Sequence, residues 1–147
     1  MSKYDKLKLE NQICFPLYAL SRKVIKLYKP LLDKHNLTYT QYITMLVIWE
    51  KEIIDFKSLG KRLHLDSGTL TPVVNKLVSM KLITKHRNEE DDRLVTIEVT
   101  DKGKQLKEEV LDVPDQLFCN FDGDMEDVMM LKKYLDKFLE ISKDQES

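Results

Sequence analysis

The sequence has few of the residues and segments that mark fibrous, secreted or membrane proteins. Its 147 residues include four glycines and four prolines, which excludes a collagen-like or linker-dominated chain. The longest apolar stretch, Tyr42 to Trp49, is interrupted by Thr44 and is far shorter than the ~20 residues of a membrane span. The charged first residues are followed by no apolar segment, so we expect no secretory signal. We therefore expect a soluble, cytoplasmic protein with no membrane partner.

Cysteine and histidine are also scarce. The two cysteines, Cys14 and Cys119, are too far apart in the sequence for a CxxC redox pair or a zinc-ligand arrangement. His35, His64 and His86 are scattered without ligand spacing, so we expect no metal site and no cofactor. In a cytoplasmic chain, two such cysteines are most often buried and inert.

The abundant residues are charged and apolar ones. Charged residues make up 33% of the chain, above the roughly one-quarter typical of soluble domains, and hydrophobic residues make up 42%. With that many apolar residues, the high charge is typical of solvated helix faces and not of disorder. The length suits a single domain over residues 1–147.

The formal net charge of −1 hides an uneven distribution along the chain. Residues 57–87 contain seven lysines and arginines against Asp66 alone, whereas residues 108–147 contain twelve acidic residues against four lysines. A basic middle and an acidic tail indicate a surface that binds a polyanion. The alternative is a chance fluctuation of solvated charges.

Two helices are predicted in the first third of the chain. Apolar residues at steps of three and four predict a long amphipathic helix over residues 7–31. Because proline removes a backbone donor, Pro16 indicates that this helix either begins near Cys14 or is bent there. Thr38 followed by Gln41 predicts a capping box at the start of a second helix, which runs to about Glu52.

The middle of the chain has the order of a winged helix. Short helices at residues 57–63 and about 69–80, joined by the polar turn 64–68, fit a helix-turn-helix. A β-hairpin around a polar loop is then predicted at residues 82–87 and 94–99. Residues 53–56 are predicted to be a connector or a single strand. The predicted fold class is mostly α with a small β-wing.

Helices at both ends of the chain carry more apolar surface than so small a core can cover. Thr100 caps a helix to about Val113, and further helices are predicted at residues 116–121 and 126–141. We assign residues 1–36 and 101–147 to dimerisation helices and residues 37–100 to a winged helix-turn-helix that binds DNA. A homodimer follows from this reading, because dimers commonly read duplex sites. The alternative is that the terminal helices pack only on each other.

Several motifs resemble the MarR family of winged-helix repressors. They are the run from Leu65 to Pro72 and the run from Glu89 to Arg93 with the following strand up to Gly103. The runs from Glu10 to Phe15, from Tyr28 to Asp33 and from Leu37 to Tyr42 are similar to the organic-hydroperoxide-sensing OhrR type within this family. Thr40 stands where relatives often have proline, and Pro16 follows Cys14-Phe15 directly.

The resemblance implies that Cys14 is a peroxide-sensing thiolate. Hydrogen bonds donated to a sulfur favour its charged, reactive form, and Tyr28 and Tyr39 match residues that donate such bonds from the partner subunit in relatives. Tyr18, one helical turn from Cys14, is a weaker candidate. Cys119 falls where two-cysteine relatives carry the residue that attacks the sulfenic acid across the dimer, whereas in one-cysteine relatives an external thiol does so.

A second set of residues is expected to contact operator DNA. Hydroxyls and free N–H groups at the start of the second helix of the helix-turn-helix can meet phosphates or base edges, and asparagine can bind an adenine edge with two hydrogen bonds. The resemblance places an arginine of the wing in the minor groove, held by an aspartate. The residues are Ser67, Thr69, Thr71, Asn75, Lys76, Lys85, Arg87, Asp91 and Arg93.

These features lead to one hypothesis and two rivals. The reduced homodimer would bind double-stranded operator DNA and be released when organic hydroperoxide oxidises Cys14, through an intersubunit disulfide with Cys119. One rival is a MarR-type repressor that a non-covalent phenolic ligand switches. The other is a thiol peroxidase, but no basic residue accompanies the thiol and the basic helix-turn-helix would be unexplained, so we expect no enzyme.

Overall fold

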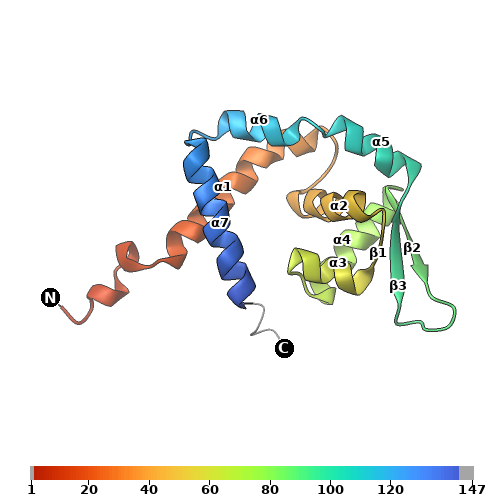
Figure 1. The fold of residues 1–147 in the computed structure, drawn as a ribbon, viewed down its shortest axis with the longest axis horizontal. Coiled ribbons are helices and arrows are strands. Elements are labelled where there is room, and N and C mark those ends of the chain that lie inside the picture. The colour runs from red at the N-terminus through yellow and green to blue at the C-terminus, as the bar shows by residue number, and fades with distance from the viewer. Residues whose placement is uncertain (1, 143–147) are drawn as a thin grey trace. The chain divides into compact units, whose positions relative to one another are not determined.

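The computed structural model describes residues 2–142 and divides into two compact units, Met1–Leu117 and Phe118–Ser147 (Figure 1). The first unit begins with two 3-10 turns at Asp5–Leu7 and Leu9–Asn11. The helices and strands that follow are α1 (Cys14–Asp33), α2 (Tyr39–Lys51), β1 (Ile53–Asp55), α3 (Phe56–Leu63), α4 (Ser67–Ser79), β2 (Ile83–Arg87), β3 (Val95–Val99), α5 (Asp101–Glu109), α6 (Val113–Asn120) and α7 (Met125–Ser142). The fold is mostly helical with a small sheet, as predicted.

A winged helix forms the middle of the first unit. The strands make an antiparallel sheet in the order β1-β3-β2, with Ile97 of β3 opposite Ile54 on one side and Lys85 on the other. Figure 1 shows β2 and β3 extending as a hairpin from the group of α2, α3 and α4. Of residues 53–56, expected to be a connector or a single strand, Ile53–Asp55 form the third strand of this sheet and Phe56 begins α3.

Side-chain caps fix where the helices of the winged helix start. Thr38 and Gln41 make both hydrogen bonds of the predicted capping box on α2. Asp66 accepts from Thr69 N at 2.7 Å and starts α4 at Ser67, two residues before the position that periodicity predicts. Thr100 accepts from Gly103 N and caps α5, which ends at Glu109. Each cap satisfies an amide that the helix itself leaves unpaired.

The helix α1 begins at Cys14, one of the two arrangements that Pro16 allows. Pro16 is the third residue of the helix, where its missing N–H costs no internal hydrogen bond. The preceding segment is held by two amide side chains: Asn11 Nδ2 donates to Asp5 O at 2.6 Å, and Gln12 Nε2 donates to Lys6 O and Lys8 O. The chain therefore enters the helix immediately before the thiol.

The hydrophobic core lies within the first unit. Its least exposed side chains come from α1, α2, α3, α4 and the sheet, and include Leu32, Met45, Ile48, Leu59, Leu70, Val74, Leu77, Ile83 and Ile97. In contrast, α1 exposes Phe15, Leu17, Tyr18 and Ile25. These four apolar side chains of α1 remain 43–59% exposed in the described part of the chain.

The helix α7 of the second unit buries none of its residues. Its exposed apolar side chains are Met125, Met129, Met130, Leu131, Tyr134, Phe138, Leu139 and Ile141. None of the helices in the described part of the chain is long and apolar enough to cross a membrane.

Candidate functional site

The helix α4 presents a polar face opposite the core. Leu70, Val74 and Leu77 are buried, and the DNA-contact residues predicted on this helix lie on its exposed or half-buried positions: Ser67, Thr69, Thr71, Asn75 and Lys76. The first-turn amides lie at the positive end of the helix dipole, which favours an anion such as a phosphate. The geometry is that of a helix whose outer face can enter a groove.

Two of these side chains already have hydrogen bonds within the protein. The hydroxyl of Thr71 donates to Ser67 O at 2.6 Å, which leaves its oxygen free only as an acceptor. The ammonium of Lys85, on β2, donates to Asn75 Oδ1 at 3.4 Å. Residues on a helix and on a strand are thereby brought together, a pairing that no local sequence pattern predicts.

The wing carries its basic residues along β2 and its turn. Arg93 lies in the turn before β3 with its side chain 92% exposed, and its Nε lies 3.2 Å from Asp91 Oδ1. The same carboxylate oxygen accepts from the Arg93 backbone N–H at 3.0 Å. Arg87 donates to Asp92 O at 3.2 Å, which closes the hairpin loop. Both arginines are thus oriented by contacts within the loop.

Both cysteines are exposed and neither forms a disulfide. Cys14 is the first residue of α1, and the N-cap residue Ile13 offers no side-chain hydrogen bond to the helix. The sulfur therefore lies beside amide groups that have no partner in the helix, where the helix dipole favours a negative charge. Cys119 lies on α6, in the other compact unit.

Three tyrosines form a cluster between α1 and α2. The ring centroid of Tyr28 lies 4.9 Å from that of Tyr39 and 5.7 Å from that of Tyr42. Burial and the two neighbouring tyrosines raise the pKa of Tyr28 to about 12, and burial also raises the pKa of Tyr39 and of Tyr42. All three hydroxyls consequently stay protonated at neutral pH and can donate hydrogen bonds.

The tyrosine cluster is far from the thiol of its own chain. Tyr28 follows Cys14 by fourteen residues of one continuous helix, which corresponds to about 21 Å along the helix axis. A tyrosine side chain cannot span that distance. Tyr18 is one turn from Cys14 but is exposed, with the guanidinium of Arg22 5.5 Å from its ring centroid. Within one chain, Tyr18 is therefore the only one of the three predicted supporting tyrosines that lies near the sulfur.

The corner between α4 and β2 is tied tightly to α5. Thr100 Oγ1 donates to Lys81 O at 2.7 Å, and Lys102 Nζ donates to Met80 O at 3.0 Å. On the buried side, Trp49 Nε1 of α2 donates to Gly103 O at 2.8 Å. Thr100 is recognisable from the sequence as a helix cap, but its contact with Lys81 and the other two bonds join segments that no sequence pattern connects.

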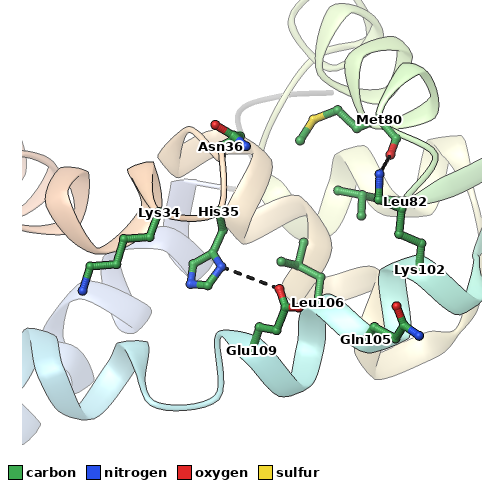
Figure 2. Close-up of a pocket in the computed structure, with 9 residues that line it drawn as sticks. All are labelled: Lys34, His35, Asn36, Met80, Leu82, Lys102, Gln105, Leu106 and Glu109. Atoms are coloured by element: carbon green, nitrogen blue, oxygen red, sulfur yellow. Dashed lines mark hydrogen bonds and ion pairs between the residues drawn. The ribbon is translucent and has the colours of Figure 1, made fainter.

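A cavity of about 270 Å³ lies beside this corner (Figure 2). Leu82, Leu106 and Met80 supply its apolar wall, and Figure 2 shows His35 and Glu109 facing each other at its edge, with His35 Nδ1 3.8 Å from Glu109 Oε2. The remaining lining residues are Lys34, Asn36, Lys102 and Gln105. None of the predicted site residues lines this cavity. Across residues 2–142, no group of three or more His, Cys, Asp or Glu side chains could hold a metal ion.

Comparison with known proteins gives matches over most of the chain. A family model described as "Transcriptional regulator SarA/Rot" matches residues 26–110. The organic hydroperoxide resistance transcriptional regulator of Bacillus subtilis is 48% identical over 139 residues, which cover 95% of each protein.

Solved structures of AbfR from Staphylococcus epidermidis are also similar. Reduced AbfR bound to DNA matches with a TM-score of 0.78 at 29% identity and covers 95% of this chain and 97% of that chain. Disulfide-formed AbfR matches with a TM-score of 0.66 at 29% identity and covers 93% and 96% respectively. The similarity to both forms extends well beyond the winged helix.

Proposed function

Since this chain belongs to the SarA/Rot family of MarR-like winged-helix transcriptional regulators and is of the organic-hydroperoxide-resistance (OhrR) type, we propose that it is a redox-sensing repressor. The reduced homodimer binds operator DNA in the cytoplasm and blocks transcription. Organic hydroperoxide oxidises Cys14 and releases the operator. Residues 37–100 carry the DNA contacts, and residues 1–36 and 101–147 make the dimer.

The DNA contacts come from α4 and the wing. Ser67, Thr69 and Thr71 meet phosphates or base edges at the start of α4, with Asn75 and Lys76 one turn further along. Lys85 and Arg87 lie on β2, and Arg93, oriented by Asp91, enters the adjacent minor groove, where the negative potential attracts a weakly hydrated guanidinium. Neutralised phosphates supply most of the affinity, so binding falls steeply with salt concentration.

The separation of Cys14 from Tyr28 and Tyr39 is the observation that carries the proposal. About 21 Å of helix lies between the thiol and Tyr28 in one chain, so these hydroxyls reach a Cys14 sulfur only if it belongs to a second copy. Tyr39, in contact with Tyr28, is expected to act on the same partner sulfur. The exposed apolar faces of α1 and α7 supply the surface for such a dimer. Each subunit then provides the thiol of one site and the donors of the other.

The chemistry has two steps. The Cys14 thiolate attacks the terminal oxygen of the hydroperoxide; the S–O bond forms, the O–O bond breaks, and the alkoxide leaves and takes a proton to become an alcohol. The Cys119 thiolate of the other subunit then attacks the sulfenic acid sulfur, and hydroxide leaves as water once protonated. Neutral tyrosine donors stabilise the thiolate without adding charge, so the site stays apolar and can bind alkyl or lipid hydroperoxides.

Release follows from the new geometry. A disulfide between α1 of one subunit and α6 of the other changes the spacing of the two winged helices, which must match successive major grooves. A few kcal/mol in favour of the non-binding arrangement lowers the affinity about a hundredfold. The solved structures of AbfR, one reduced and bound to DNA and one with a disulfide formed, support a switch of this kind.

The test is duplex binding by purified protein before and after one equivalent of cumene hydroperoxide. The duplex is one that the reduced protein selects from a random-sequence pool. The wild type should lose about a hundredfold in affinity and give a dimer band on non-reducing electrophoresis. Cys14→Ser should bind equally well with and without peroxide. Cys119→Ser is the matched control: its Cys14 oxidises, but no dimer band forms.

Three results would contradict parts of the proposal. Release of Cys14→Ser by hydroperoxide would make the thiol a bystander and favour a switch by a non-covalent phenolic ligand. If the oxidised wild type gave only a monomer-sized band, no intersubunit disulfide would form, and an external thiol would react with the Cys14 sulfenic acid instead of Cys119. Steady-state consumption of hydroperoxide in the presence of a thiol reductant would instead indicate a peroxidase.

A further inference from the structure

The contact between Lys85 and Asn75 bears on which base the protein reads. Lys85 is half-buried on β2, and its backbone is fixed opposite Ile97 in the middle strand of the sheet. Its ammonium donates to Asn75 Oδ1 at 3.4 Å, whereas Asn75 is exposed on the polar face of α4. The strand β2 thus places the positive charge of Lys85 beside Oδ1, the only acceptor atom of the Asn75 side chain.

This contact changes what Asn75 can offer to DNA. An asparagine binds adenine through two bonds: its Oδ1 accepts from the adenine N6 amino group and its Nδ2 donates to N7. With an ammonium beside Oδ1, an incoming N6 amino group meets a positive charge, and one of the two lone pairs of that oxygen is already in use. The Nδ2 hydrogens of Asn75 and the remaining hydrogens of the Lys85 ammonium make this pair richer in donors than an asparagine alone.

Guanine is the base that matches a set of donors. Its major-groove edge presents two acceptors, O6 and N7, whereas adenine presents one acceptor and one donor. We propose that Asn75 and Lys85 act together as a guanine-reading pair in the major groove, with Lys85 as the residue that sets the preference. The proposal rests on the DNA-binding function above and replaces the adenine contact that the sequence alone suggests for Asn75.

A simple phosphate contact by Lys85 makes a different prediction. A lysine that only neutralises phosphate contributes equally to every sequence, so its removal weakens binding without changing base preference. A lysine that occupies the asparagine acceptor alters the preferred base at one position. Without the Lys85 ammonium, both Oδ1 and Nδ2 of Asn75 are available to a base, and such an asparagine favours adenine.

The experiment selects binding duplexes from a random-sequence pool with the reduced full-length protein and compares base preferences position by position. The wild type should prefer guanine at one position of each half-site by about tenfold or more, the range of a good bidentate contact. Asn75→Ala should reduce that preference, and Lys85→Met should change it from guanine to adenine at the same position. Lys85→Arg, which keeps the charge and the donors, should retain guanine.

Lys76→Met serves as the comparison for charge loss, since it should weaken binding at every sequence and leave the preferences unchanged. Circular dichroism of each variant checks that it is folded. The proposal is overturned if Lys85→Met keeps the full guanine preference, or if Asn75→Ala alters no position. If the wild type enriches no sequence at all, operator binding itself fails, and with it both proposals. Enrichment with no effect of either substitution overturns the guanine-reading pair alone.

Discussion

Replacement of Gly103 by alanine tests how closely α5 is joined to the corner between α4 and β2. An added methyl group would overlap the carbonyl oxygen of Leu82 and lie 2.7 Å from Cγ2 of Val99. The carbonyl cannot move away freely, because the Thr100 N–H donates to it at 3.1 Å. The helix must therefore shift away from the corner, which also strains the Trp49–Gly103 hydrogen bond.

The expected size of the effect follows from three contributions. Overpacking of this kind costs about 1–3 kcal/mol, and loss or weakening of one buried hydrogen bond costs about 1 kcal/mol more. Alanine in a helix recovers about 1 kcal/mol relative to glycine. Gly103→Ala should therefore lower the free energy of unfolding by about 2 kcal/mol. For a chain of this length that corresponds to a fall of about 6 °C in Tm.

Two other glycines provide matched controls, measured by urea and thermal unfolding at one protein concentration. A methyl group at Gly68 would meet only Asp66 Oδ1 at 3.5 Å, an ordinary contact, so Gly68→Ala should be as stable as the wild type or slightly more stable. At Gly60 the nearest atom is Leu65 O at 3.0 Å, which predicts an intermediate effect. A Gly103→Ala protein as stable as Gly68→Ala would refute the close contact between α5 and the corner.

Three further predictions concern the tyrosines, a cap and the wing. In an alkaline titration followed by absorbance at 295 nm, Tyr28, Tyr39 and Tyr42 should ionise above the ordinary tyrosine pKa of 10, because burial raises their pKa values, that of Tyr28 to about 12. Since the folded pKa of Tyr28 exceeds the unfolded value of about 10, its contribution to stability is complete below pH 10 and is lost as the pH rises towards 12. Thr38→Ala should lower the free energy of unfolding by about 1 kcal/mol through loss of the capping box, whereas Thr38→Ser should be nearly as stable as the wild type. Equal urea midpoints for the wild type and both variants would contradict the role of the cap. Arg93→Ala should weaken duplex binding and reduce the slope of log K against log salt by about 1, and an unchanged slope would place the arginine outside the minor groove.

Local signals in the sequence predict most of the helices well. The Thr38–Gln41 capping box and the Thr100 cap are each complete within four residues, and both form as expected. The start of α4 is less certain from sequence, because several residues in a row can serve as caps. The hydrogen bond from Thr69 N to Asp66 decides between them. A cap is predictable when one candidate stands alone.

Contacts between residues far apart in the chain are not predicted by the local sequence patterns. The three residues of β1 are too few to show an alternating pattern, and they become a strand because Ile54 pairs with Ile97. The contact of Lys85 with Asn75 likewise depends on how β2 packs against α4. The residue types of the candidate site were recognisable from the sequence, but the atoms that each one has available for a ligand depend on these tertiary contacts.

The two ends of the proposed switch are connected through α2. Its first turn carries Tyr39, which packs against Tyr28 and is proposed to sense the partner's sulfur. Its last turns carry Trp49, which holds Gly103 of α5 through a buried hydrogen bond, and α5 in turn holds the end of α4 through Thr100. Packed helices shift as units because a close-packed core has little free space to absorb small movements. A displacement of the tyrosine end of α2 is therefore resisted at, or transmitted to, the corner that follows α4, the helix proposed to contact DNA. A loose contact at Gly103 would uncouple the proposed sensing residues from the proposed DNA-binding residues.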